Sequence, residues 1–108
     1  MLKVAVFVSG GGTDLQSIID ACQNHEINAE IKLVVSSRKK AYGLERARLA
    51  GIKAEYIRDD ELLIQRLQEE EIELIVLAGY LAIVSDRLIE LYQDVYKRQV
   101  QDMLILIQ

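Results

Sequence analysis

The sequence lacks proline and tryptophan, and it contains one cysteine and one histidine. Because a single cysteine cannot form a disulfide within the chain, we expect a reducing, cytoplasmic location. A long hydrophobic run is also missing. The apolar run at the start of the chain, Met1–Val8, is much shorter than the ~20 apolar residues that span a bilayer. We therefore expect a buried strand there, and neither a signal peptide nor a membrane partner.

An excess of basic residues is absent as well. The formal net charge is −4 and the isoelectric point is about 5.0. Proteins that bind nucleic acids or membrane surfaces usually carry a basic surplus, so we expect neither partner. Apolar residues make up 51% of the 108 residues, which is enough for the core of one small domain and excludes a disordered tail. We assign no metal ligands.

Short β-rich apolar runs alternate with amphipathic helical patterns along the chain. Nearly all-apolar strands indicate a parallel sheet that helices cover on both faces. With right-handed crossovers, this order predicts an α/β fold, a doubly wound, Rossmann-like parallel sheet that stops after about four strands. Its exposed edge is expected to favour self-association. The expected strands are 4–8, 31–35, 54–57 and 73–77, and the expected helices are 13–24, 41–50, 60–70 and 85–92.

Three helix ends carry recognisable signals. Thr13 and Gln16 have the spacing of a capping box, which places Thr13 at the N-cap of the first helix. Gly51 follows the second helix in the usual C-terminal position. Ser85 is the expected N-cap of the last helix, with Asp86 in its first turn.

The predicted topology also indicates where a ligand would bind. In a doubly wound sheet, ligands bind at the carboxyl ends of the strands, near the point where the strand order reverses. Three segments should therefore meet at that edge: 10–14, 36–40 and 78–84. The first of them connects the first strand to the first helix.

This first segment is a glycine-rich loop. Glycines allow the backbone to approach a ligand closely, and the free N–H groups at a helix start favour an anion. The glycines could instead form only a tight turn, but the strand–loop–helix context favours a phosphate. The candidate substrate-binding residues are Gly10, Gly11, Gly12, Thr13 and Asp14.

The pattern constrains the place of a phosphate site more closely than it constrains which phosphate ligand binds there. The dinucleotide fingerprint would need a glycine where Leu15 stands, and no Gly-Lys-Ser/Thr follows the glycines as a P-loop requires. Arg38 could serve an NADPH oxidoreductase, but without the third glycine a solvated charge explains it better. The pattern favours a sugar phosphate, and a non-catalytic phosphate- or nucleotide-binding module remains an alternative.

Three stretches, 8–16, 41–47 and 77–81, occur in an order and spacing that resemble the N-terminal half of the phosphoribosylglycinamide formyltransferases. These are folate-dependent formyl-transfer enzymes of purine synthesis. The resemblance covers residues 2–93. Formyltetrahydrofolate deformylase and methionyl-tRNA formyltransferase share the fold, but 10–16 together with 42–46 favours the glycinamide enzyme.

The resemblance implies two ligands. The glycine loop would hold 5-phosphoribosylglycinamide through its phosphate, and a second segment would line the site for 10-formyltetrahydrofolate. Asp14 stands where the family often has asparagine, and its carboxylate should repel a phosphate unless it contacts the substrate's amine end. Many relatives carry a basic residue in place of Ala82. The implied folate-binding residues are Leu81, Ala82, Ile83 and Val84.

The resemblance also implies an incomplete catalytic apparatus. The family carries an Asn-x-His-Pro motif after the next strand, and this chain has none. Its one histidine, His25, should be a surface residue at the end of the first helix. We therefore name no catalytic residue and expect the chain alone to be inactive. Residues 1–93 would form a formyltransferase-like subdomain and 94–108 a non-native tail, in which 103–107 either pairs as a strand or is exposed.

Overall fold

Strands and helices alternate along the chain as far as residue 91, as the sequence predicts. The computed structural model describes residues 1–78, 85–91, 94–97 and 103–107. The elements are β1 (Leu2–Val8), α1 (Thr13–Gln23), β2 (Ala29–Ser36), α2 (Tyr42–Leu49), β3 (Ala54–Tyr56), α3 (Asp60–Glu69), β4 (Leu74–Ala78), α4 (Asp86–Leu91), β5 (Asp94–Lys97) and β6 (Met103–Ile107).

The strands form one sheet in the order β3-β2-β1-β4-β6-β5. β1 pairs in parallel with β2 and with β4, and β2 pairs in parallel with β3. The chain thus runs outward from β1 to β3 and then returns to β4 on the other side of β1. The strand order reverses between β1 and β4, so the carboxyl ends of these two strands flank the crevice in which such sheets bind ligands.

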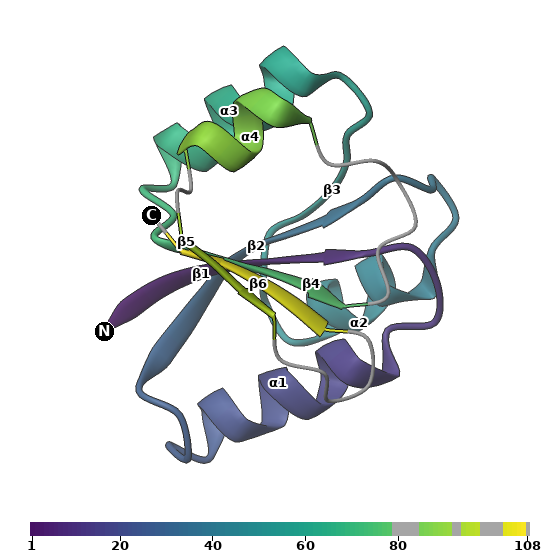
Figure 1. Cartoon of the computed structure of the whole chain (residues 1–108). Helices are drawn as coiled ribbons and strands as arrows, with labels where there is room; N and C mark the ends of the chain where they lie inside the picture. Colours follow the sequence, from purple (N-terminus) through teal and green to yellow (C-terminus); the bar gives the residue numbers. More distant parts are fainter. Residues whose placement is uncertain (79–84, 92–93, 98–102, 108) are drawn as a thin grey trace.

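Helices cover both faces of the sheet (Figure 1). α1 and α2 lie on one face, and α3 and α4 lie on the other. None of the helices in the described part of the chain is long and apolar enough to cross a membrane. Alternate side chains of β1 enter two separate buried clusters. One contains Phe7, Leu33, Leu63, Leu67, Ile75 and Leu88, and the other contains Val4, Val6, Leu15, Ile19, Leu44 and Ala47.

Two of the three predicted helix ends are confirmed. Gly51 follows the end of α2 with φ +75°, the left-handed conformation that glycine adopts without strain. Ser85 precedes α4, and its Oγ accepts a hydrogen bond from the Leu88 N–H at 3.1 Å. The same hydroxyl donates to Asp60 Oδ1 at 2.7 Å, which links the start of α4 to the start of α3.

The capping box predicted for α1 is wrong. Gly12 occupies the N-cap with φ +76°, Thr13 is the first helical residue, and no side chain caps the helix. The side-chain amide of Gln16 donates instead through Nε2 to Asp20 Oδ1 at 3.0 Å, one turn further along the helix. Gly12 adopts a left-handed conformation, which glycine tolerates without strain. The helix therefore begins one residue earlier than it would with Thr13 as the cap.

The parallel sheet stops after four strands, as predicted, but the expectation that its edge at β4 is exposed is wrong. β6 pairs with β4 in antiparallel register, from Leu74 opposite Ile107 to Ala78 opposite Met103, and β5 pairs with β6. The apolar run 103–107 therefore forms a further strand, the first of its two predicted alternatives. An open strand edge presents unpaired backbone N–H and C=O groups, and an apolar segment of the same chain satisfies them here.

A network of ion pairs fastens α3 to β3. Arg66 lies 2.7 Å from the Glu55 carboxylate and 3.2 Å from the Glu70 carboxylate. Lys53 Nζ donates to Glu70 at 2.9 Å, and only 11% of the Glu70 side chain is exposed. Lys53 and then Arg66 lower the pKa of Glu70, while Glu55 raises the pKa of Arg66.

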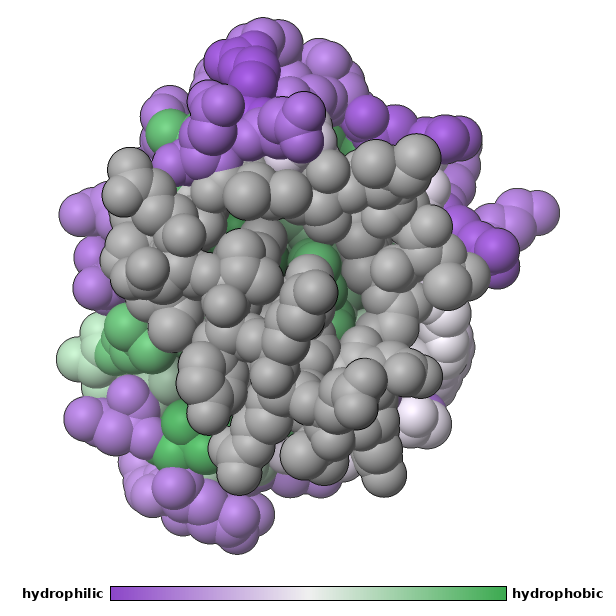
Figure 2. Space-filling model, viewed as in Figure 1, coloured by the Kyte–Doolittle hydropathy of each residue, from purple (hydrophilic) through white to green (hydrophobic). Residues whose placement is uncertain are grey.

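Hydrophilic residues dominate the surface over α3 and α4 at the top of Figure 2.

The lowered pKa of Glu70 gives a pH-dependent prediction. Its contribution to stability is present at neutral pH and is lost as the pH falls through the folded-state pKa, below the ordinary value of 4.5. Glu70→Gln should lower the free energy of unfolding at pH 7 by about 1 kcal/mol. Urea denaturation should show this difference at pH 7 and a much smaller one at pH values well below 4.5.

The matched control is Glu30→Gln. Glu30 pairs with Lys32 at 3.6 Å on the exposed surface, so its loss should change the stability little at either pH. Equal effects of the two substitutions at neutral pH would contradict a special contribution from the Glu70 network.

Candidate functional site

The glycine loop lies at the carboxyl end of β1, between two neighbouring strand ends. Val8 is in register with Ser36 of β2, and Phe7 is in register with Leu77 of β4. The structure therefore brings segments 10–14 and 36–40 to the same edge of the sheet, as predicted. Of the third predicted segment, only Ala78 is described. The implied folate residues lie outside the described residues: Leu81, Ala82, Ile83 and Val84.

The loop is held from one side by the start of α2. The Gly43 N–H donates to the Gly10 carbonyl at 3.0 Å. A Cβ added to Gly12 would lie 2.7 Å from Gly43 Cα, and one added to Gly43 would lie 2.9 Å from Val8 Cγ2. Side chains at positions 12 and 43 would thus force the loop and α2 apart, and this explains why glycines stand at both.

Arg46 adds a second attachment from the same helix. Its Nε donates to the Gly11 carbonyl at 2.7 Å, and its Nη1 lies 3.4 Å from Gln16 Oε1. Its guanidinium stacks over the Tyr42 ring, 5.0 Å from the ring centroid, which restricts its orientation. We call the two hydrogen bonds from the Gly43 N–H and Arg46 Nε the α2 clamp.

The α2 clamp fixes the direction of the loop amides. In a trans peptide, the carbonyl and the following N–H point in opposite directions. Because the Gly10 and Gly11 carbonyls face α2, the N–H groups of Gly11 and Gly12 face away from it. Within the described residues, the N–H groups of 11–14 donate to no protein acceptor. Successive free amides at a helix start form a concave donor site that suits an anion.

Serine side chains hold the neighbouring segment 36–40 beside the loop. Ser9 and Ser37 share a hydrogen bond between their hydroxyl oxygens at 3.1 Å. The buried Ser36 hydroxyl accepts from the Arg38 N–H and donates to the Arg38 carbonyl, both at 2.9 Å. This local turn presents a basic tripeptide, residues 38–40, at the same edge of the sheet as the glycine loop.

Positive charge is distributed unevenly over the described part of the chain. Away from this edge, basic side chains pair with carboxylates. The exposed side chains of Arg38, Lys39 and Lys40 have no carboxylate partner among the described residues, and the same holds for Arg58 after β3. The paired residues are Lys3, Lys32, Arg48, Lys53, Arg66 and Arg87. A net-acidic chain therefore carries an electropositive edge beside its free amides.

Asp14 lies where the sequence places it, half-buried in the first turn of α1. Its carboxylate makes no hydrogen bond or ion pair with the described residues. A carboxylate at a helix start is favourable in the absence of a ligand, because it lies near the positive end of the helix dipole. It would also compete with a bound phosphate, so its contact with a substrate amine stays a prediction.

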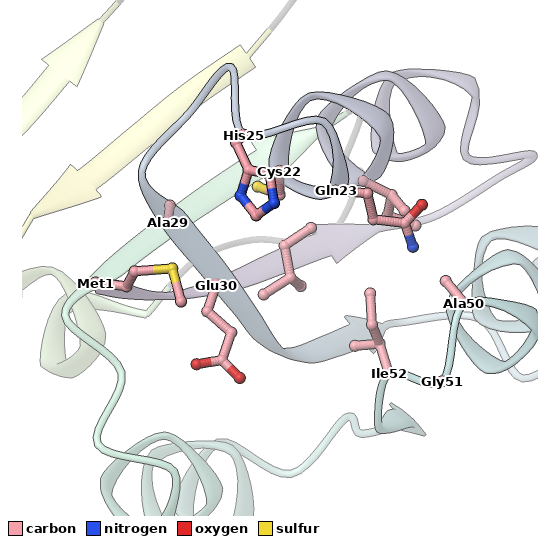
Figure 3. Close-up of a pocket in the computed structure, with 11 residues that line it drawn as sticks. Met1, Cys22, Gln23, His25, Ala29, Glu30, Ala50, Gly51 and Ile52 are labelled. Carbon is pink, nitrogen blue, oxygen red and sulfur yellow. The ribbon is translucent and has the colours of Figure 1, made fainter.

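Cys22 and His25 lie at the opposite end of the sheet. Together with Met1, Glu30 and Ile52 they line an open pocket of about 340 Å³ (Figure 3). His25 is an exposed residue just beyond α1, as predicted. Burial raises the pKa of the Cys22 thiol, which makes it less reactive rather than more. Neither side chain can reach a ligand at the glycine loop.

The parallel strand order, the helical connections and a glycine loop at the strand-order reversal define a Rossmann-like α/β protein. The particular family follows from comparison with known proteins. The model of the formyl transferase family matches residues 2–96, and the chain belongs to this family.

Individual relatives agree with this assignment. The chain is 43% identical over 96 residues to the phosphoribosylglycinamide formyltransferase of Haemophilus influenzae, a match that covers 81% of this chain and 45% of that protein. It is similar in structure to glycinamide ribonucleotide transformylase 1 from Symbiobacterium toebii, with a TM-score of 0.79 and 37% identity over 83% of this chain and 47% of that one. For glycinamide ribonucleotide transformylase 1 from Geobacillus kaustophilus, the TM-score is 0.81 and the sequence identity is 29%. That match covers 86% of this chain and 54% of the other one. The chain spans about half the length of the curated relatives it matches.

Sequence reasoning placed the loop but missed the α2 clamp. Gly43 and Arg46 lie within the stretch 41–47 that carries the family resemblance, but the sequence pattern predicts no role for either residue. A usable signal was present, because a glycine in the first turn of a helix is unfavourable unless another backbone must approach it. The spacing of Tyr42 and Arg46 also places an aromatic ring and a cation on the same helix face.

The close approach of the two glycines is testable with a matched pair of substitutions. Gly12 and Gly51 have φ values of +76° and +75°, but an added Cβ meets Gly43 in the first case and nothing within 4 Å in the second. Gly51→Ala should cost about 1 kcal/mol of stability from backbone strain alone. Gly12→Ala should cost about 1–3 kcal/mol more, because the loop must move away from α2.

Thermal and urea denaturation of the two variants would measure this difference. Equal destabilisation by both substitutions would show that the loop and α2 are not in close contact.

Proposed function

We propose that this chain is the phosphate-binding N-terminal half of a phosphoribosylglycinamide formyltransferase. The observation that carries the proposal is the row of unbonded amides at 11–14, of which the α2 clamp turns the first two, those of Gly11 and Gly12, away from α2. The unpaired basic residues beside it supply the charge that attracts a phosphate. The names of the relatives supply the substrate, because the row of amides by itself would accept any phosphate monoester of suitable size.

In the proposed reaction, a formyl group passes from 10-formyltetrahydrofolate to the amine of 5-phosphoribosylglycinamide. The glycine loop, Gly10–Asp14, would anchor the substrate phosphate and so position the distant amine for attack on the formyl carbon. Residues 81–84, which come after β4 in the sequence, would line the folate site. This arrangement would put the two substrates near the carboxyl ends of β1 and β4, which are adjacent strands.

We further propose that the 108-residue chain binds substrate without turning it over. Formyl transfer needs a donor that stabilises the oxyanion and groups that move protons. The only histidine, His25, lies at the far end of the sheet, beyond the end of α1. Among the residues singled out at the loop, only Asp14 carries an ionisable group, and its carboxylate cannot donate to an oxyanion at neutral pH.

The proposal predicts phosphate-dependent binding without catalysis. Isothermal titration should show that the chain binds 5-phosphoribosylglycinamide and binds the dephosphorylated glycinamide riboside at least tenfold more weakly, because the loss of a charged hydrogen-bonding group costs about 1.5–3 kcal/mol. With 10-formyltetrahydrofolate added, no formylated product should accumulate.

Three results would each count against a part of the proposal. Equal binding of the phosphorylated and dephosphorylated substrates would remove the glycine loop from the site. Binding of a nucleotide, with none of the glycinamide substrate, would instead identify a non-catalytic nucleotide-binding module. Steady formation of formylated product would refute the proposed inactivity while leaving the substrate assignment in place.

A further inference from the structure

One residue of the α2 clamp, Arg46, lies on the carbonyl side of the glycine loop. We propose that Arg46 is a positioning residue for the phosphate site, which acts through the Gly11 carbonyl and does not itself contact the phosphate. The inference rests on the proposed phosphate-binding function of the loop. It concerns how the loop amides are kept pointing toward a bound phosphate, and it identifies α2 as an element that affects the affinity of the loop for phosphate.

The first argument is the place of the guanidinium. Arg46 Nε donates to the Gly11 carbonyl at 2.7 Å, so the group lies on the carbonyl face of the loop. The free N–H groups point to the opposite face. Stacking on Tyr42 and the contact with Gln16 occupy the guanidinium further. A phosphate on the amide face would therefore be separated from Arg46 by the Gly11–Gly12 peptide.

The second argument is the freedom of the peptide that Arg46 holds. Gly11 lies between two other glycines, and glycine backbones populate positive and negative φ about equally. Without a partner for the Gly11 carbonyl, the Gly11–Gly12 peptide can rotate and carry the Gly12 N–H away from the anion face. Gly43 fixes only the preceding peptide, through the Gly10 carbonyl. Each attachment of the clamp thus controls a different donor of the site.

The third argument is the contrast with the other basic residues at this edge. Arg38, Lys39 and Lys40 are exposed and hold no backbone group of the glycine loop, so they can act on an anion only through their charge. Arg46 is only partly exposed and is bonded to the loop. Loss of Arg38 should therefore change the salt dependence of phosphate binding, whereas loss of Arg46 should change the affinity at every salt concentration.

The test compares Arg46→Met with Arg38→Met, which remove the same charge from the same edge. Inorganic phosphate and ribose 5-phosphate serve as probes, and their dissociation constants are measured over a range of salt concentrations. Arg46→Met should weaken binding about tenfold, the effect of losing one well-placed hydrogen bond, and keep the salt dependence of the unmodified chain. Arg38→Met should weaken binding less and reduce the salt dependence.

A second variant and a second measurement separate this inference from the phosphate proposal. Arg46→Lys keeps the charge but replaces the planar fork with a single ammonium, so it should resemble Arg46→Met if position matters and the unmodified chain if charge matters. In the ligand-free protein, ¹⁵N relaxation should show greater motion of the Gly11 and Gly12 amides in both Arg46 variants and not in Arg38→Met.

The outcomes are distinct. Failure of the unmodified chain to bind either probe would refute the phosphate proposal, and the relaxation measurement would still decide the role of Arg46. Unchanged loop motion in both Arg46 variants would overturn the positioning role. A salt dependence in Arg46→Met that falls as it does in Arg38→Met, with normal binding by Arg46→Lys, would show that Arg46 acts as a charge.

Discussion

Two backbone segments that are far apart in the sequence meet where Gly12 faces Gly43, and the carboxyl edge of the sheet depends on this contact. Only at this separation can α2 donate to two successive loop carbonyls, Gly10 through a backbone amide and Gly11 through Arg46. The direction of the Gly11 and Gly12 amides follows from those bonds. The candidate site is thus an outcome of helix packing as much as of a glycine motif.

Most of the fold follows from local patterns. Val4–Val8 and Leu74–Leu77 are continuous apolar runs, which a strand buried on both faces requires, and their predicted bounds agree with β1 and β4 within two residues. Gly51 ends α2 and Ser85 caps α4 through contacts that are local in the sequence, so both roles could be predicted from the sequence as well. The place of the glycine loop was predictable for the same reason, because a strand–loop–helix sequence determines which end of the sheet the loop occupies.

The errors concern groups whose partners are distant in sequence. Thr13 and Gln16 have the spacing of a capping box, but Gly12, in a left-handed conformation and packed against α2, is the N-cap instead. The pairing of β6 with β4 was one of two open readings, since an apolar run does not reveal which strand edge it will meet. The direction of the amides at 11–14 was equally out of reach, because it depends on an arginine 35 residues away from Gly11.

The central position of β1 has a consequence for synthesis on the ribosome. β1 emerges first, yet one of its partners is β4, and the Lys3 amide bonds to Glu73, 70 residues later. At roughly 5–20 residues per second, β1, whose last five residues are all buried in the folded protein, waits several seconds with one edge unpaired. During that interval the unpaired backbone groups of β1 are available to other chains or to chaperones. The order of translation, rather than the finished structure, therefore sets the period of greatest risk of misassembly.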